Sequence, residues 1–387
     1  MHHFYGINLS ATRIDFQGFV VSSDSVQPMR IFSNEFSDDL LHRLVPGEIL
    51  QQALTSFDIL RQHLTSTAKG HSWIKGWKEY LGSATQAPVG VGIGIPYAMA
   101  PLVREALRIA VAEATGMACK TKSSDLAVWS DSAISPCFTV EIPLAIAIEK
   151  HASENYGAFG IISPGFERVE ATLVTISRDQ ITVRDFREWS PGDKPTIWND
   201  WALSNSTIRW LKLSNQDGDF GAEPTAGDVA FEVISAEDVT RGVARYVWSK
   251  QPSNRMQRLP TIQRAVPRAL GVVVRNSGGE LFWHRLVCAG AKWPIKPVIL
   301  RGRFGKDVVI HVACCVNDCG GNDWLPQSKW LGCLHWWQEP LPPTQSESLG
   351  PTPIGQLSLK FASSDEGFQF CSAVIDREDV ADSQNPA

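Results

Sequence analysis

Aromatic and histidine side chains are the most concentrated source of chemical function in this sequence. The chain holds 14 tryptophans, each of which supplies a large apolar face and one N–H donor. The densest group lies late in the chain and consists of Trp324, Trp330, His335, Trp336 and Trp337, and the same region also holds Trp283, His284 and Trp293. An earlier group consists of Trp198, Trp201 and Trp210. Such residues either fill an aromatic core or form the walls of a mostly apolar ligand pocket with a few orienting donors.

A second candidate site is the turn between the apolar runs at residues 159–162 and 169–176. It reads Ser-Pro-Gly-Phe-Glu-Arg over residues 163–168 and looks like a phosphate-binding hairpin that lacks the residues needed to hold phosphate. Pro164 has no amide hydrogen, Phe166 adds bulk, and Glu167 would repel phosphate in a partly dry cleft. We therefore predict that Phe166 and Arg168 line a cleft that holds something other than a nucleotide.

Patterns typical of metal and cofactor sites are weak. Four cysteines between Cys314 and Cys333 lie near His335, but they lack the Cys-x-x-Cys pairing that is typical of zinc sites. The alternating glycines of residues 90–94 lead into Pro96, so we interpret them as part of a strand and not as a nucleotide loop. The sequence predicts no cofactor and no metal.

Composition excludes several classes of function. The net charge is −5 with no basic block, which argues against a nucleic-acid partner. No apolar run approaches the length of a membrane span, and the N-terminus does not resemble a signal peptide. We therefore expect a cytoplasmic protein with reduced cysteines. At 387 residues the chain is long enough for two or three domains.

The periodicity of the apolar residues predicts a mixture of strands and helices followed by strands alone. Ser235 opens a capping box for a helix that runs to about Trp248, and residues 251–264 have the composition of a linker. Helical patterns cover residues 38–80 and 101–115, and a further helix starts near Pro143. Strands are expected at residues 4–9, 14–21, 89–95, 159–162, 169–176 and 181–186, and in an all-β region after residue 270.

Three motifs in order resemble the ATPase domain of the 70-kDa heat-shock chaperones. They are Gly-Ile-Asn-Leu-Ser-Ala-Thr at residues 6–12, Gly-Ile-Pro-Tyr at 94–97 with the helix that follows, and Glu-Ile-Pro-Leu-Ala-Ile-Ala at 141–147. A fourth, Ala-Leu-Gly-Val-Val at 269–273, resembles the start of the chaperones' β-sandwich domain. The resemblance implies an α/β fold of the actin and hexokinase type. The expected domains are lobe I (1–155), a reduced lobe II (156–265), a β-sandwich-like module (266–376) and a disordered tail (377–387).

The departures from this family predict that the nucleotide site is degenerate. Asn8 stands where the family has the aspartate that organises the metal and the attacking water, and Ser10 stands where it has a glycine. The second glycine loop is replaced by the turn at residues 163–168, and the adenosine motif is missing. Turnover of ATP is therefore the least favoured of the three functions considered.

Two other functions remain. The first is a cofactor-free cyclase, or pericyclase, that holds a small hydrophobic polyene for an intramolecular Diels–Alder reaction. In that case Tyr97, His284, His335 and Trp336 are the candidate catalytic donors. The walls of its ligand site would be Phe166, Arg168, Trp198, Trp201, Trp283, Trp330 and Trp337. The second is a degenerate chaperone that binds a peptide or protein partner in its β module.

Overall fold

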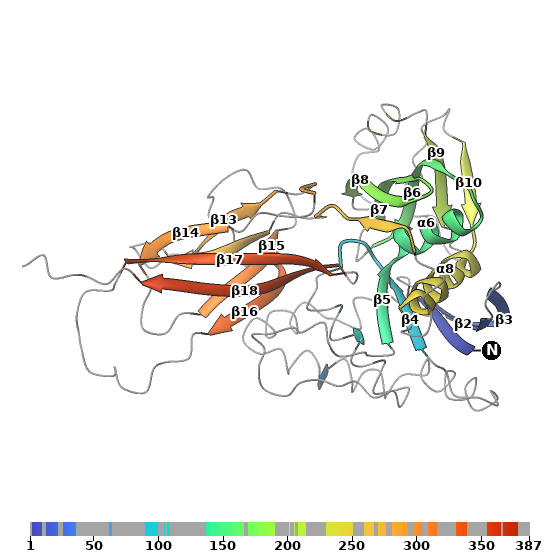
Figure 1. The fold of residues 1–387 in the computed structure, drawn as a ribbon, viewed down its shortest axis with the longest axis horizontal. Helices are drawn as coiled ribbons and strands as arrows, with labels where there is room; N and C mark the ends of the chain where they lie inside the picture. Colours follow the sequence, from blue (N-terminus) through green and yellow to red (C-terminus); the bar gives the residue numbers. More distant parts are fainter. Residues whose placement is uncertain are drawn as a thin grey trace, which may run out of the picture.

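The computed structural model describes the parts of the chain that form the sheets and the helices between them (Figure 1). The described residues are 2–9, 13–21, 26–35, 62–63, 90–99, 104, 107–108, 111, 137–165, 169–189, 201, 205, 208–213, 230–250, 259–266, 270–275, 281–288, 290–292, 298–303, 309–315, 330–338, 354–364 and 367–377. Most of the two helical patterns predicted at 38–80 and 101–115 lies outside these residues, as does the tail after residue 377.

The first sheet has five strands in the order β3-β2-β1-β4-β5. They are β1 (His2–Leu9), β2 (Arg13–Val21), β3 (Val26–Glu35), β4 (Gly90–Ile95) and β5 (Cys137–Glu141). The β1–β2 and β2–β3 pairs are antiparallel, whereas β4 pairs in parallel with both β1 and β5. The described side chains of β1 and β4 are buried, as expected for central strands that are covered on both faces.

The second sheet repeats this plan and adds one strand. Its order is β10-β9-β6-β7-β8-β11. The strands are β6 (Gly157–Pro164), β7 (Val169–Ile176), β8 (Gln180–Trp189), β9 (Arg209–Leu213), β10 (Phe231–Ile234) and β11 (Thr261–Gln263). An antiparallel meander, β6-β7-β8, is again followed by two parallel strands, here β9 and β10. The two sheets therefore share one strand order and one set of directions, with β11 added in parallel to β8.

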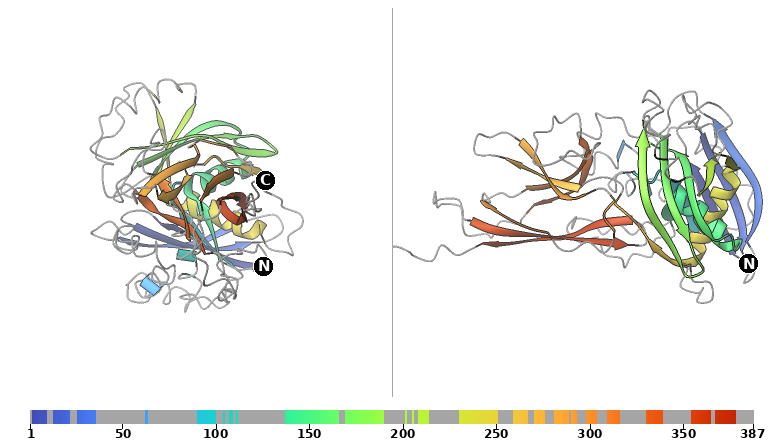
Figure 2. Two further views of the ribbon diagram at one scale, coloured as in Figure 1. Left: turned by 90° about the vertical axis from the view of Figure 1, so that its left-hand side faces the viewer. Right: turned by 90° about the horizontal axis from the view of Figure 1, so that it is seen from above.

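Two helices lie between the sheets (Figures 1 and 2). Helix α6 (Ile142–Ala152) follows β5 directly, has a proline in its first turn and has two basic residues in its last. Helix α8 (Ala236–Ser249) begins with the predicted capping box, in which Ser235 and Asp238 exchange hydrogen bonds. An apolar cluster that includes Ile146, Phe159 and Tyr246 joins both helices to the second sheet.

Glycines let α8 approach its neighbours closely. A Cβ on Gly242 would lie 1.9 Å from the carbonyl oxygen of Ala145, at the crossing of α8 and α6. One on Gly92 in β4 would lie 2.4 Å from a side-chain carbon of Val243. The alternating glycines of β4 are therefore sites of helix packing, which confirms that they belong to a strand and not to a nucleotide loop.

The C-terminal third forms two antiparallel sheets within the described residues, with orders β13-β12-β15-β16 and β14-β17-β18. These seven strands gather at one end of the molecule in Figure 1. Their bounds are β12 (Leu270–Arg275), β13 (Leu281–Val287), β14 (Val298–Arg303), β15 (Val309–Cys315), β16 (Trp330–Gln338), β17 (Ile354–Ser364) and β18 (Gly367–Arg377). Every helix or strand that the structure describes after residue 270 is a strand.

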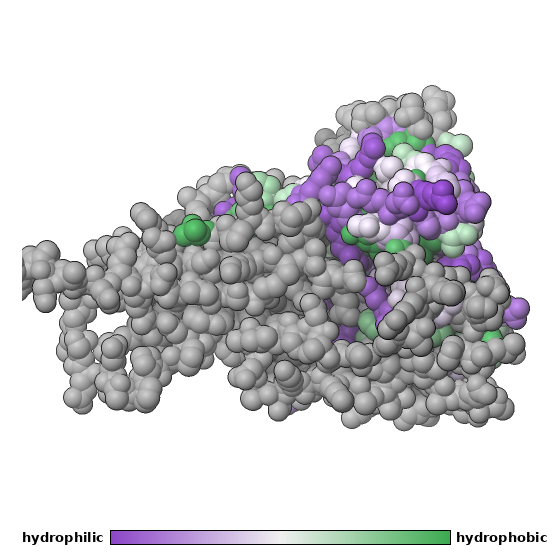
Figure 3. All heavy atoms as spheres, in the orientation of Figure 1, coloured by the Kyte–Doolittle hydropathy of each residue, from purple (hydrophilic) through white to green (hydrophobic). Residues whose placement is uncertain are grey.

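The structure also contains strands that the sequence patterns did not predict, namely β3, β5, β9, β10, β11 and β16. Strand β11 corrects the interpretation of residues 251–264 as a simple linker, because residues 261–263 pair with β8. In the view of Figure 3, the described residues of the two-sheet body present a mainly hydrophilic surface. No described helix is long and apolar enough to cross a membrane.

Candidate functional site

A cluster of buried polar groups lies where the carboxyl ends of the parallel strands of both sheets meet. In open α/β sheets, ligands bind in the crevice outside these strand ends. The turn after β4 supplies Tyr97 and Ala98, β5 ends at Glu141, and β7 begins beside Glu170. The segment after β11 adds Arg264. All of these residues are less than a tenth exposed, so the cluster is an interior one.

Glu141 is held by two arginines, one 37 positions before it in the chain and the other 123 positions after it. The Nε and Nη2 atoms of Arg264 donate to its two oxygens at 3.1 and 3.2 Å, and Arg104 donates at 3.1 Å. Burial by itself raises the pKa of the Glu141 carboxyl, but the charges of Arg264 and Arg104 lower this pKa by more, so that it falls to about 2. Glu141 in turn raises the pKa of Arg264 above its ordinary value despite burial. The carboxylate therefore stays ionised and fully occupied by internal donors.

Tyr97 joins three parts of the chain. Its backbone N–H donates to Glu170 Oε2 at 2.7 Å, and the next N–H, of Ala98, donates to Oε1 at 3.2 Å. Its hydroxyl donates to the carbonyl of Ala265 at 2.7 Å and accepts from the N–H of the same residue at 3.2 Å. Burial, followed by the charge of Glu141, raises the pKa of the Tyr97 hydroxyl well above its ordinary value. The proton therefore stays on the hydroxyl at neutral pH and is engaged by Ala265.

Asn8 and Ser163, which stand where the chaperone resemblance would place two aspartates, are also buried. Asn8 Nδ2 donates to Asp15 Oδ2 at 3.1 Å, across the β1–β2 pair. Ser163, at the end of β6, is fully buried, and its hydroxyl has no hydrogen-bond partner among the described residues. Ser163 pairs across the ladder with Glu170. These side chains contribute one amide and one hydroxyl to the strand ends where the resemblance would have placed two aspartates.

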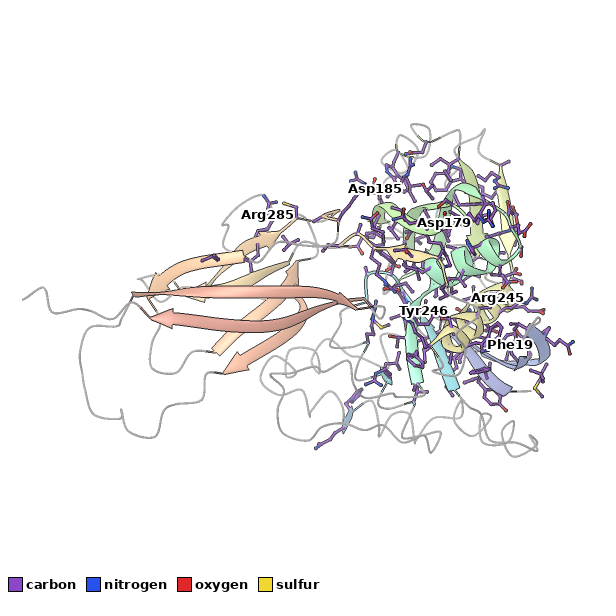
Figure 4. All side chains as sticks on the ribbon, in the orientation of Figure 1. Phe19, Asp179, Asp185, Arg245, Tyr246 and Arg285 are labelled. Carbon is purple, nitrogen blue, oxygen red and sulfur yellow. The ribbon has the colours of Figure 1, made fainter. Side chains whose placement is uncertain are left out.

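Two members of the earlier tryptophan group, Trp201 and Trp210, pack against the second sheet. Trp201 Nε1 donates to Asp185 Oδ2 at 3.0 Å, and its ring meets that of Trp210 edge-on at 5.7 Å between centroids. Asp185 lies on β8 and is labelled in Figure 4. A Cβ on Gly160 would lie 2.3 Å from the indole of Trp210, so the indole lies directly against the backbone of β6. Trp201 is thus placed by packing, with its donor already used.

The later candidates occupy the two edge strands of one C-terminal sheet. Trp283 and His284 lie on β13, and Trp330, His335, Trp336 and Trp337 lie on β16. The register aligns His284 with Val272, Val272 with Val312, and Val312 with His335. The two histidines therefore share one row, three strand spacings or about 14 Å apart. Phe166, Arg168 and Trp198 lie outside the described residues.

Of the residues that form the buried cluster, the sequence patterns pointed to Tyr97 but not to the charged residues around it. Glu141 was part of a recognised motif but was given no role, and Glu170 stood at the end of the hairpin without a function. Arg104 and Arg264 carry no local signal, since each lies far along the chain from the glutamate that it binds. No described group of three or more His, Cys, Asp or Glu residues could hold a metal ion.

Neither a protein-family model nor a curated protein matches the chain. The Ppx/GppA phosphatase of Aquifex aeolicus matches with a TM-score of 0.32 and 6% identity, over 56% of this chain and 68% of that one. An exopolyphosphatase from Cytophaga hutchinsonii matches at 0.28 and 7%, over 55% and 67%. YeaZ from Pseudomonas aeruginosa matches at 0.29 and 10%, over 64% and 94%.

TM-scores this low carry no argument about function or closer kinship. The conclusion that stands is an α/β fold with two mixed sheets. The narrower resemblance to the 70-kDa heat-shock chaperones stays a prediction.

Proposed function

We propose that the chain is a nucleotide-independent protein that binds a small hydrophobic molecule on a repurposed actin-like framework of the heat-shock-chaperone type. The observation that carries nucleotide independence is the Glu170 carboxylate, which accepts the backbone N–H groups of Tyr97 and Ala98 at 2.7 and 3.2 Å. These three residues join the strand ends of the two sheets, where the resemblance would place a nucleotide.

The groups present at the strand ends do not fit a magnesium–nucleotide complex. Magnesium is held by carboxylates and water in octahedral geometry. Here one carboxylate, Glu141, is neutralised by two arginines, and another, Glu170, is saturated by amides. Asn8 Nδ2 is already bound to Asp15, and its Oδ1, which has no hydrogen-bond partner among the described residues, is a single neutral oxygen. Binding a metal at this place would require these contacts to break, and the resulting buried arginines would lack a counter-ion.

Titration calorimetry with ATP and magnesium tests this part of the proposal. We expect no heat of binding at protein concentrations that would detect micromolar affinity. The full chain at pH 7.5 is the sample, and an actin-like ATPase measured under the same conditions is the positive control. A micromolar dissociation constant would refute nucleotide independence.

The reaction that we propose for the hydrophobic ligand is a cofactor-free intramolecular cyclisation of the Diels–Alder type. Two new carbon–carbon bonds form within one polyene and no atom is lost, so the protein need supply only a reactive conformation and a hydrogen bond to a conjugated carbonyl. Because the Tyr97 hydroxyl is engaged by Ala265, the histidines on the C-terminal sheet become the preferred donors. Those histidines are His284 and His335, with Trp336 beside the latter.

Incubation of the full chain with linear polyenes that carry a conjugated carbonyl tests the reaction. EDTA is present and ATP is absent, and products are followed by liquid chromatography with mass detection. We expect cyclised product of unchanged mass, and a loss of at least about tenfold in rate when His335 is replaced by Ala. The matched control is His151→Ala, at the end of α6. No turnover of any candidate by the wild-type chain would count against a cyclase.

A second function, peptide binding by a degenerate chaperone, is favoured by one specific observation. Strand β14 is an edge of its sheet within the described residues, and Ile299 on that strand is 61% exposed. An exposed sheet edge can accept an extended peptide as an additional strand. A peptide-array screen tests this function, and Ile299→Lys is expected to abolish any binding that uses this edge. A protein partner and a cytoplasmic location also remain part of the proposal.

A further inference from the structure

Residues 261–266, which we call the docked segment, contact both sheets of the body and also lead into the C-terminal strands. Thr261 N–H donates to the carbonyl of Asp179 at 2.9 Å, at the turn before β8, and residues 261–263 then run in parallel to β8. Figure 4 labels Asp179 on the second sheet. Beyond Ala265, the N–H of Val266 donates to Ala291 O at 2.9 Å.

The docked segment is recognised in the way that a bound peptide is recognised. Residues 261–263 pair with β8 through their backbone. Arg264 enters a buried site, where two of its nitrogen atoms donate to Glu141. Both backbone polar groups of Ala265 bind the Tyr97 hydroxyl. A sheet edge supplies affinity through backbone pairing, and side-chain pockets supply specificity. A planar guanidinium bound through two hydrogen bonds is a specific contact.

We propose that the β8 edge, together with the buried Glu141 and Tyr97 beside it, is a peptide-binding site, which the chain fills with its own residues 261–266. The ligand class is an extended strand in which an arginine is followed by a small residue. In this protein the occupied site fixes the C-terminal strands to the two-sheet body. The inference depends on no nucleotide and on no hydrophobic ligand, so its tests can fail independently of the proposed function.

Arg264→Ala is the variant that separates docking from folding. This substitution does not leave Glu141 buried without a counter-ion, because Arg104 remains 3.1 Å away. The matched control is Arg187→Ala, which removes an arginine of β8 that is 62% exposed and 3.7 Å from Asp185. Both variants change the net charge equally.

Hydrogen exchange of the full chain is the first measurement. In Arg264→Ala we expect the amides of residues 261–266 to exchange at least about tenfold faster, while those of β6 and β7 stay within about twofold of wild type. Tyr97→Phe is expected to act in the same direction because it leaves both backbone groups of Ala265 without a partner. Arg187→Ala should change neither region. Wild-type exchange at residues 261–266 in a folded Arg264→Ala chain would overturn the proposal.

Binding in trans is the second measurement. A fluorescent nine-residue peptide, Leu-Pro-Thr-Ile-Gln-Arg-Ala-Val-Pro, copies residues 259–267. By anisotropy it should bind the Arg264→Ala chain at least about tenfold more tightly than the wild-type chain, whose own segment competes at high effective concentration. The same peptide with Ala in place of Arg should lose that binding. Equal affinity of the two peptides, or of the two proteins, would show that the site does not recognise this segment.

Discussion

The buried carboxylate of Glu141 should make the stability of the first sheet depend on pH in a defined acid range. Its pKa falls from an ordinary 4.5 to about 2 in the folded chain, because two arginines outweigh the effect of burial. A carboxyl whose folded pKa is the lower one stabilises the fold above its unfolded pKa, and this contribution disappears as pH falls through the folded pKa. The window is therefore from about pH 5 down to about pH 2.

The size of the effect follows from the two pKa values. The difference between 4.5 and about 2 corresponds to roughly 3 kcal/mol of stability that is present at pH 5 and largely absent at pH 2. Glu141→Gln removes this titration. At neutral pH it should also destabilise the chain by about 3–5 kcal/mol, because Arg104 and Arg264 lose their buried counter-charge.

The assay is the free energy of opening of the β5 amides, measured by hydrogen exchange at several pH values in wild type and Glu141→Gln. We expect the gap between the two proteins to narrow by roughly 3 kcal/mol as the pH falls from 5 to 2. Glu154→Gln makes the same chemical change at an exposed residue and should show no such gap. A gap that stays constant over this range would refute the role assigned to the two arginines.

Three further substitutions test other parts of the body. Gly242→Ala would place a Cβ 1.9 Å from the carbonyl oxygen of Ala145, so we expect a loss on the order of 3 kcal/mol or more in chemical denaturation. Asn8→Asp would set a second buried carboxylate beside Asp15, whose Oδ2 now lies 3.1 Å from the Asn8 amide nitrogen. Two like charges at this distance raise the pKa of one of the two carboxyls in the folded chain. The substitution should therefore lower the melting temperature more at pH 7.5 than at pH 5. Glu170→Ala leaves two buried N–H groups without an acceptor, and should destabilise the joint between the sheets by about 2–6 kcal/mol and speed exchange at residues 97–98.

Each of these three has its own contradicting result. Wild-type stability in Gly242→Ala would show that the two helices can separate without cost. If Asn8→Asp lowered the melting temperature by the same amount at both pH values, or gained micromolar affinity for ATP with magnesium, the strand-end site would be more open than its burial indicates. Unchanged exchange at residues 97–98 in Glu170→Ala would show that the sheets are held together elsewhere.

Local patterns were sufficient for the elements whose formation depends on near neighbours. The capping box at Ser235 and the proline in the first turn of α6 define helix starts within a few residues, and the apolar runs across residues 159–186 predict a hairpin and a third strand, which the structure shows as β6, β7 and β8. Strands β9, β10 and β11 are short, and their pairing depends on partners elsewhere in the chain. Strand β16 was recognised only as an aromatic cluster, because its tryptophans do not alternate with polar residues.

The sequence by itself determined the hairpins and the two helices between the sheets, and it predicted that the strand ends lack the residues that a nucleotide would need. Those features depend on residue types within a few positions, such as Asn8 at the end of β1 and the turn after Ser163. Only the tertiary structure decided which groups lie together at the strand ends. Glu141 and Arg264 are 123 positions apart, and Tyr97 and Glu170 are 73 apart. Charges at strand ends meet because the parallel strands of two sheets point at one another, and no local pattern encodes that arrangement.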